Sequence, residues 1–404
     1  MLIEKSNLSK NCLHDKVILV TGGGGGIGLE TVKALAYLNA KVIIAEINKE
    51  KGIYAEESIN KELNSNLVHF IHTDISDAKQ IDRLYTYIKT NFKHLDVILN
   101  NAVITPLGEV EKVSIDDWDK SYSVNLRGPI LLIKKFLPDM KKRNSGTIVF
   151  VPSSGAAPYM GAYEIFKTSQ VELCNTLAGE LENTSIITYS IGPGLVKTDT
   201  AKKAIETVSK LMNITMDEFY KMNENHIIDE ETAGTGFAVS IALAARYNGL
   251  EIGSIQALID GGLFKEEEKK EVSMELTPNM QKELKLILMN IIKTYEEQYK
   301  GWMERNIFER QWVLRDFKKT MGRSADEVLN SLEYLEKSAE INDINQVLNN
   351  KNIFIDLKKY YERQYKLLLS YEKNSEKLKE SWEYINSWIF DIDSILNILS
   401  DNIN

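Results

Sequence analysis

Five consecutive glycines, Gly22–Gly26, stand between two apolar segments of different pattern near the start of the chain. Residues 17–20, Val-Ile-Leu-Val, form a continuous apolar run that is typical of a buried strand. Beyond the glycines, apolar residues recur at helical spacing, at Ile27, Val32, Leu35 and Leu38. Because glycine has no Cβ, it tolerates positive φ and lets backbone N–H groups approach a phosphate closely. The stretch therefore predicts a strand-to-helix turn of the dinucleotide-binding kind, with Gly22, Gly26 and Gly28 holding the spacing TGxxxGxG, rather than a flexible linker.

Composition limits the kind of protein and the kind of partner. The chain has 404 residues, of which 43% are hydrophobic, and this is enough for two or three domains with a sizeable core. The net charge of −9 and the lack of clustered Lys and Arg argue against a nucleic acid or an anionic membrane as partner. Residues 1–16 lack the apolar centre of a signal peptide, and no later apolar run has the length of a membrane span. We expect a cytoplasmic protein.

The cysteines and histidines give no sign of a disulfide framework or a metal site. Cys12 and Cys174 lack any ligand spacing and are expected to be inert. His69 and His72 are three residues apart in a strand-like run, so their side chains should point to opposite faces of a sheet. We expect no bound metal.

Residues 16–264 alternate short apolar runs with helical patterns, which is typical of an α/β fold with a Rossmann-like doubly wound parallel sheet. Seven runs are expected to be strands: residues 16–20, 40–46, 66–73, 95–100, 146–151, 186–192 and 254–260. The alternation stops at a charged run, residues 265–271. We expect one domain over residues 1–264 and a second over residues 265–404.

Residues 265–404 are helical by every local signal. Thr277 and Pro278 suit an N-cap and the first helical position, and Ser324 with Glu327 forms a capping-box pattern. Three segments have apolar residues at helical spacing: Leu284, Leu288, Ile291, Tyr295 and Trp302; Val328, Leu332 and Leu335; Phe354, Leu357, Tyr361 and Leu368. A last seam alternates steps of four and three, at Leu378, Trp382, Ile385, Ile389, Ile392, Leu396 and Leu399. We expect an antiparallel helical hairpin or small bundle.

Tyr163 and Lys167 are four residues apart, in a segment that follows an apolar strand and the pair Ser153 and Ser154. On a helix this spacing brings the ammonium near the phenol. A tyrosine titrates at about 10, which is too high for a general base near neutral pH, and a neighbouring cation can lower that pKa by about one to three units. The pair alone is common on amphipathic helices, so its position after the strand is what indicates proton transfer.

With these motifs in order, residues from about 10 to 264 resemble the short-chain dehydrogenase/reductase family. The glycine loop matches the family's TGxxxGIG, so Gly22, Gly26, Ile27 and Gly28 would bind the cofactor. Four further segments match: Asp74 with Ile75 at the adenine, Asn101 and Ala102 in NNAV, Asn125 in SVNLRGP, and Pro193, Gly194, Val196 and Thr198 in PGLVKTDT. The segment 259–262 resembles the family's last strand and its turn, and Val103 replaces the final Gly of NNAG.

The resemblance implies a mechanism for the matched residues. Tyr163 would pass a proton to or from the substrate oxygen while hydride moves between the substrate carbon and the nicotinamide. Lys167 would hold the nicotinamide ribose and lower the pKa of Tyr163, and Asn125 would order a water in a proton relay. A serine would donate a hydrogen bond to the substrate oxygen. Counting from Gly146 favours Ser153 for this role and counting from the following GAA favours Ser154, and we prefer Ser153.

The cofactor preference depends on Glu46, at the end of the second apolar run. A carboxylate at this position accepts hydrogen bonds from the adenosine ribose hydroxyls and repels a 2′-phosphate. The glycine loop carries no Lys or Arg to compensate, although Lys49 is close in sequence. The sequence therefore favours NAD over NADP.

Two classes of function remain open. The chain is either an NAD(P)-dependent oxidoreductase acting on a small alcohol or carbonyl, or a dehydrogenase-like nucleotide-sensing or scaffolding module that acts through its helical region. The complete set of Asn125, Ser153, Tyr163 and Lys167 favours the enzyme. The helical region is expected to be an internal bundle or a self-association element of a homo-oligomer, and the alternative is docking of a protein partner. The resemblance implies that residues 201–228 shape the substrate pocket. Its apolar candidates, which fit a plain amphipathic helix equally well, are Met212, Met216, Phe219, Tyr220 and Met222.

Overall fold

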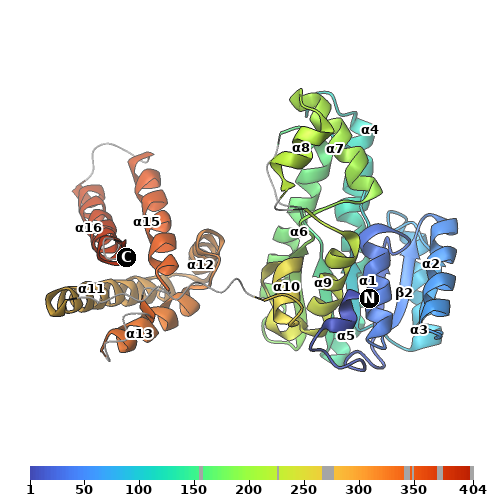
Figure 1. Ribbon diagram of the computed structural model, residues 1–404, viewed down its shortest axis with the longest axis horizontal. Coiled ribbons are helices and arrows are strands. Elements are labelled where there is room, and N and C mark those ends of the chain that lie inside the picture. The colour runs from blue at the N-terminus through green and yellow to red at the C-terminus, as the bar shows by residue number, and fades with distance from the viewer. Residues whose placement is uncertain are drawn as a thin grey trace. The chain divides into compact units, whose positions relative to one another are not determined.

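The computed structural model describes residues 1–153, 158–224, 227–265, 277–340, 346–347, 350–370 and 376–400. The chain divides into two compact units, Met1–Glu266 and Glu267–Asn404 (Figure 1). The first unit contains a sheet with helices on both faces, and the second is helical.

The sheet of the first unit is parallel and has seven strands. They are β1 (Val17–Thr21), β2 (Lys41–Glu46), β3 (Val68–His72), β4 (Val97–Asn100), β5 (Gly146–Phe150), β6 (Ile186–Gly192) and β9 (Glu251–Gly253). Their order is β3-β2-β1-β4-β5-β6-β9, so the direction of strand addition reverses between β1 and β4. In sheets of this kind, ligands bind at that reversal, beside the carboxyl ends of the strands. The predicted Rossmann-like fold is confirmed.

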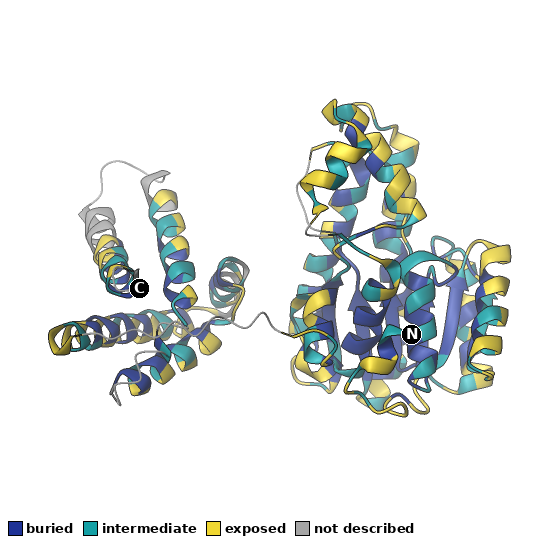
Figure 2. Cartoon of the chain, viewed as in Figure 1, coloured by how far each residue is buried: buried dark blue, intermediate teal, exposed yellow. Residues whose placement is uncertain are grey.

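Both faces of the sheet are buried, which explains why its strands read as continuous apolar runs. In β1, Ile18 and Val20 join one hydrophobic cluster, and Val17 and Leu19 join the other. Figure 2 shows the resulting buried layer across the sheet and the inner sides of the helices.

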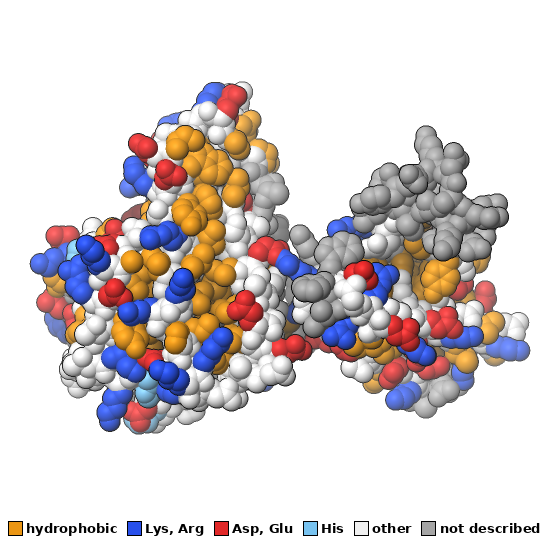
Figure 3. Space-filling model, turned by 180° about the vertical axis from the view of Figure 1, so that it is seen from behind, with side chains coloured by type: hydrophobic (Ala, Val, Ile, Leu, Met, Phe, Trp, Pro, Cys, Tyr) orange, Lys and Arg blue, Asp and Glu red, His pale blue; other side chains and the backbone are white. Residues whose placement is uncertain are grey.

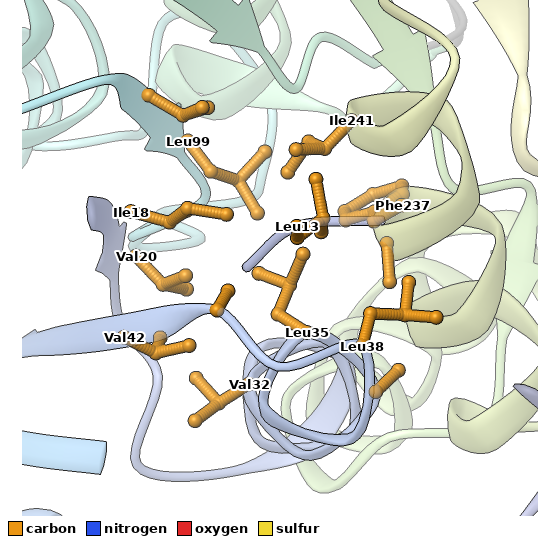
Figure 4. Close-up of a cluster of buried hydrophobic side chains, with 14 of the residues drawn as sticks. Leu13, Ile18, Val20, Val32, Leu35, Leu38, Val42, Leu99, Phe237 and Ile241 are labelled. Carbon is orange, nitrogen blue, oxygen red and sulfur yellow. The ribbon is translucent and has the colours of Figure 1, made fainter. Parts of the chain in front are cut away.

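Helices cover the two faces of the sheet. The cluster containing Ile18 includes residues of α1 (Gly26–Tyr37), α2 (Lys49–Glu62) and α9 (Glu230–Ala242), and Figure 4 shows its centre. The opposite cluster includes residues of α3 (Ala78–Phe92), α5 (Gly128–Arg143) and α6 (Gly161–Glu180). The remaining elements of this unit are η1 (Leu2–Lys5), α4 (Ile115–Ser121), η2 (Tyr122–Arg127), β7 (Leu195–Val196), α7 (Asp199–Met212), α8 (Met216–Met222), β8 (Ile227–Ile228), η4 (Ala244–Arg246) and α10 (Ser254–Asp260).

The expected strand over residues 254–260 is wrong, because this segment forms helix α10. The last strand is the shorter β9, which pairs with the end of β6. Ser254, Ala257 and Leu258 are the buried residues of α10, and their spacing of three and four is helical rather than alternating. The likeness of residues 259–262 to a final strand and turn fails for the same reason.

The second unit consists of α11 (Pro278–Met303), α12 (Ile307–Met321), α13 (Ala325–Glu340), α15 (Asn352–Ser370) and α16 (Glu376–Ser400). Its predicted helix starts are confirmed. Thr277, which directly precedes Pro278, accepts a hydrogen bond from the Met280 N–H. The Ser324 N–H donates to the Glu327 carboxylate, and the Glu327 N–H donates to the Ser324 hydroxyl oxygen.

One hydrophobic cluster fills the second unit. Aromatic rings lie at its centre, with Phe317 and Tyr360 4.8 Å apart and Tyr361 and Trp388 4.4 Å apart between centroids. Apart from Leu368, the three predicted apolar segments are buried in it: Leu284, Leu288, Ile291, Tyr295, Trp302, Val328, Leu332, Leu335, Phe354, Leu357 and Tyr361. The side chains of Leu368, Leu378, Trp382 and Trp312 lie outside the described residues.

The predicted seam of α16 is partly wrong. Ile385, Ile392 and Leu399 are buried as expected, but Trp388 and Ile395 complete the buried row. Ile389 and Leu396 are only partly buried and pack against the edge of the cluster. A helix advances 100° per residue, so adjacent positions can share a broad apolar stripe, and their packing partners decide which one is central.

No helix in the described parts of the chain is long and apolar enough to cross a membrane. Hydrophobic side chains nevertheless gather on one face of the first unit (Figure 3). A groove of that unit between α5 and α6 is lined by Ile133, Leu137, Pro138, Leu173 and Leu177, with Lys134, Lys141, Thr176 and Glu180.

Candidate active site

The glycine turn after β1 leaves no room for side chains at two positions of the TGxxxGxG motif, Gly22 and Gly28. Gly22 has a φ of +67°, and a Cβ there would lie 2.9 Å from the Cα of Ala102. A Cβ on Gly28 would lie 2.2 Å from the Gly22 carbonyl oxygen and 2.7 Å from Asn101 Nδ2. Gly26 also has a positive φ, of +54°. These three glycines therefore build a turn whose backbone faces the end of the sheet, as the spacing predicts.

Asn101 and Thr21 fix this turn to the end of the neighbouring strand β4. The Asn101 amide donates to the carbonyl oxygens of Thr21 and Gly22 at 3.0 and 3.1 Å. In return, the Thr21 hydroxyl oxygen accepts hydrogen bonds from the N–H groups of Asn101 and Ala102, both at 3.0 Å. Asn101 and Ala102 thus lie against the glycine turn, and their contact with a cofactor stays a prediction. Thr21 was not predicted as a site residue, although it opens the TGxxxGIG motif.

Glu46 lies against the glycine turn from the end of β2. Its carboxylate accepts hydrogen bonds from the Gly24 N–H at 3.2 Å and the Asn48 N–H at 2.9 Å. A Cβ on Gly25 would lie 3.7 Å from the ammonium nitrogen of Lys51. The cation at the turn is therefore Lys51, from the start of α2, which sequence reasoning missed because it considered only Lys49.

Asp74 and Ile75 follow β3 and support the turn into α3. Asp74 Oδ1 accepts hydrogen bonds from the N–H and hydroxyl of Ser76, at 2.8 and 2.7 Å. Ile75 is buried against Gly128, where a Cβ would approach the Ile75 side chain to 2.9 Å. Both residues have structural contacts here, and their contact with a nucleotide stays a prediction.

The PGLVKT segment meets the glycine turn from the other side. A Cβ on Gly26 would lie 3.5 Å from the Thr198 methyl carbon, and Thr198 also caps α7 by accepting from the Ala201 N–H at 2.9 Å. Gly194 has a φ of +80°, and Val196 pairs with Ile228 in the small β7–β8 sheet. The Pro193 carbonyl accepts a hydrogen bond from Ser254 at 2.9 Å.

Asn125 lies in the π-helix η2, fully buried, and is joined to both α6 and the segment after β4. Its side chain accepts from the Ile104 N–H at 3.0 Å and donates to the Ile104 carbonyl at 2.9 Å. It also donates to Ser121 Oγ at 2.9 Å, and Ser121 in turn donates to the Ala162 carbonyl on α6 at 3.0 Å. The side chain predicted to order a water is therefore engaged with protein groups.

Tyr163 and Lys167 lie on one face of α6, as their spacing predicts. Burial lowers the pKa of the Lys167 ammonium to about 7, while the neighbouring Glu164 carboxylate raises it. The Lys167 nitrogen is buried and has no hydrogen-bond partner among the residues that the structure describes. Glu164, also buried, was not predicted as part of this site.

The expectation of a lowered Tyr163 pKa is wrong for this structure. Burial of the phenol raises the pKa of Tyr163, a hydrogen bond with Ser153 lowers it, and the Glu164 carboxylate raises it. Desolvation opposes the charged phenolate and outweighs the hydrogen bond. Ser153 thus lies beside Tyr163, whereas Ser154 lies outside the described residues.

Strand order brings these groups to one edge of the sheet. The glycine turn, Asn101 and Ser153 follow β1, β4 and β5, which are adjacent in the sheet. Within the described residues, no group of three or more His, Cys, Asp and Glu side chains could hold a metal ion.

Comparison with known proteins identifies the family. The family model for short chain dehydrogenase matches residues 16–209. An uncharacterized oxidoreductase of Thermotoga maritima is 34% identical over 187 residues, which cover 46% of this chain and 73% of that protein. The chain belongs to the short chain dehydrogenase family and is an oxidoreductase that acts on alcohols or carbonyls.

A further relative agrees with this family, and a solved structure shares the fold. Cyclopentanol dehydrogenase of Comamonas sp. is 30% identical over 197 residues, which cover 48% of this chain and 78% of that protein. The crystal structure of levodione reductase superposes with a TM-score of 0.56 at 24% identity and covers 61% of this chain and 98% of its own. The residues that match the family model, 16–209, lie within the first unit.

Proposed function

We propose that this chain is an NAD-dependent oxidoreductase that interconverts a small alcohol and its carbonyl compound, with Tyr163 as the proton donor and acceptor. The observation that carries the proposal is the position of Tyr163 and the buried Lys167 on α6, joined through Ser121 and Asn125 to the segment that holds the glycine turn. A proton-transfer group and a nucleotide turn are thereby parts of one connected edge of the sheet.

The residues fit a nicotinamide dinucleotide. The glycine turn leads into the N-terminus of α1, where backbone N–H groups that no side chain covers can approach a pyrophosphate. The buried Lys167 ammonium, without a partner among the described residues, is suited to ribose hydroxyls. When bound, the cofactor supplies or accepts the hydride.

The protein residues would handle the proton. Because the pKa of Tyr163 is raised, the residue is a neutral phenol at neutral pH, which is the form that donates a proton to a carbonyl oxygen. Ser153 would donate a second hydrogen bond to the same oxygen and stabilise the charge that develops on it. A protonated Lys167 stabilises the phenolate left after transfer, since an opposite charge nearby favours the charged form.

NAD is proposed over NADP because the Glu46 carboxylate is held at the glycine turn by two backbone N–H groups. A 2′-phosphate would meet this negative charge. Lys51, whose side chain lies near Gly24 and Gly25, is a nearby cation that would weaken the repulsion.

The function is tested by screening small primary, secondary and cyclic alcohols with NAD, and ketones with NADH, while following NADH absorbance. Cyclic secondary alcohols come first because a relative is named as a cyclopentanol dehydrogenase. The proposal expects substrate-dependent turnover that Tyr163→Phe removes. Tight NADH binding without turnover on any class would contradict it and would favour the nucleotide-sensing alternative.

A further inference from the structure

The side chain of Gln170 is buried in the first unit with no role in the steps above. It lies on α6 three residues after Lys167 and seven after Tyr163, so the three side chains share one face of the helix. Gln170 has no exposed surface, and its Nε2 donates to the backbone carbonyl oxygen of Asn125 at 2.5 Å. Its Oε1 is buried with no partner among the described residues. Burying the unpaired Oε1 of Gln170 therefore costs free energy, and its Nε2 makes a single hydrogen bond, to Asn125.

The Asn125 carbonyl cannot accept the usual α-helical hydrogen bond, because the residue four positions later is a proline. In an α-helix that carbonyl would accept a hydrogen bond from the N–H of residue 129. Residue 129 is Pro129, which has no N–H and whose ring clashes with the carbonyl four residues earlier. The helix widens at this point into the π-helix η2, where the Gly128 N–H bonds to the Ser123 carbonyl five residues back.

The widened turn determines where Asn125 is held. From it, the Asn125 side chain clamps both backbone groups of Ile104, in the segment that continues from Asn101 and Ala102. Asn101 and Ala102 in turn hold the glycine turn through Thr21. The Asn125 peptide is thus connected by hydrogen bonds both to α6, which carries Tyr163, and to the segment that holds the glycine turn.

We propose that Gln170 is a positioning residue, whose amide replaces the hydrogen-bond donor that Pro129 removes and thereby fixes Asn125 for catalysis. The catalytic part rests on the proposed function. The hydrogen-bond part rests only on Gln170, Pro129 and Asn125, so it can be tested without a substrate.

A double-mutant cycle tests the hydrogen-bond part in the full-length protein. Gln170→Met keeps the length of the side chain and removes the donor, so the buried Asn125 carbonyl loses a partner and Tm should fall by about 3 °C or more. Pro129→Ala restores a backbone N–H at the fourth position, so the double variant should recover most of that fall. Pro138→Ala, at the other proline of α5, is the matched control and should give no recovery. Additive effects of Gln170→Met and Pro129→Ala would overturn the proposal.

Kinetics test the positioning part, with the substrate found by the alcohol and ketone screen. Gln170→Met should lower kcat about tenfold while KM and the NADH Kd stay within about twofold, and Pro129→Ala should restore kcat in the double variant. An unchanged kcat, with coupling in Tm, would reduce Gln170 to a structural residue and overturn the proposal. Absence of turnover in the wild-type protein would instead contradict the proposed function. If Gln170→Met alone does not fold, recovery of folded protein in the double variant supports the inference, and no recovery contradicts it.

Discussion

Gly28→Ala probes the glycine turn with a single methyl group. The new Cβ would lie 2.2 Å from the Gly22 carbonyl oxygen and 2.7 Å from Asn101 Nδ2, both far inside van der Waals contact. These two atoms are hydrogen-bonded to each other at 3.1 Å, so neither is the free end of a flexible side chain. The methyl group can be accommodated only if the backbone of the turn moves away from β4.

Two effects oppose each other in this variant. Replacing Gly by Ala inside a helix stabilises it by about 1 kcal/mol. Forcing an extra methyl group into a packed site costs about 1–3 kcal/mol, and the upper part of that range applies where backbone atoms must move. We expect a net loss of about 1–2 kcal/mol in the free energy of unfolding of the first unit, because a separation of 2.2 Å cannot be relieved by a rotamer change.

Binding should suffer as well. Moving the turn would displace the N–H groups that the proposed function assigns to the pyrophosphate, and we expect the NADH Kd to rise at least tenfold, equivalent to about 1.4 kcal/mol. NADH fluorescence titration and urea unfolding measure the two effects. Gly25→Ala is the matched control, because its φ of −171° suits any residue and its Cβ would meet only Lys51, at 3.7 Å. Equal NADH affinity in the two variants would refute the steric account of the turn.

Three further predictions concern charge and domain structure. Glu46→Gln should narrow the preference for NADH over NADPH, since it removes the negative charge at the turn, and comparable Kd values for both cofactors in the wild-type protein would contradict the NAD proposal. Burial lowers the pKa of Lys167 in the folded chain to about 7, whereas the ordinary value is about 10.5. Between these two pH values the unfolded chain binds more protons at this residue than the folded chain does, so the free energy of unfolding rises with pH. Urea unfolding at pH 7 and pH 9 should show this rise in the wild-type protein and a smaller one in Lys167→Met, whereas an equal rise in both would be inconsistent with a lowered pKa. A chain ending at Phe264 contains the whole sheet and the glycine turn, so it should bind NADH as tightly as the full chain does. Size-exclusion chromatography with light scattering should show a lower oligomeric state for it if the helical unit mediates self-association. Failure of the shortened chain to bind NADH would show that the helices complete the first unit.

The sequence predicts those parts of the fold that depend on local pattern. Strands buried on both faces are largely apolar along their length, so residues 17–20 and 97–99 are recognisable as strands without any partner. The glycine turn is recognisable because positive φ and close backbone approach exclude other residues. Residues 254–260 form a helix where the pattern predicts a strand, because a short apolar run does not distinguish a strand from a buried helix and only packing decides between them. The choice of Trp388 over Ile389 in α16 depends on packing in the same way.

Contacts in the candidate site are predictable where both contacting residues lie in one sequence motif. They are not predictable where the two residues come from elements that are distant in sequence. The i, i+4 spacing of Tyr163 and Lys167 lies within one helix. Lys51 lies near Gly25 because of the position of α2 in the fold, and no local sequence pattern predicts that contact. For Gln170 there was a usable signal, because a proline four residues after Asn125 leaves a carbonyl that must find another donor. The direction of the Tyr163 pKa also depends on burial, which is a property of the packed structure.

The central claim is that Tyr163 transfers the proton, and the most direct measurement compares kcat with NADH affinity in Tyr163→Phe. This variant keeps the ring and removes only the hydroxyl, so kcat should fall by about 10²–10⁴-fold while the NADH Kd stays within about twofold. Tyr122→Phe, at a tyrosine that is 42% exposed and whose ring packs on Phe166, is the matched control and should change neither quantity. Turnover near the wild-type rate in Tyr163→Phe would show that another group carries the proton.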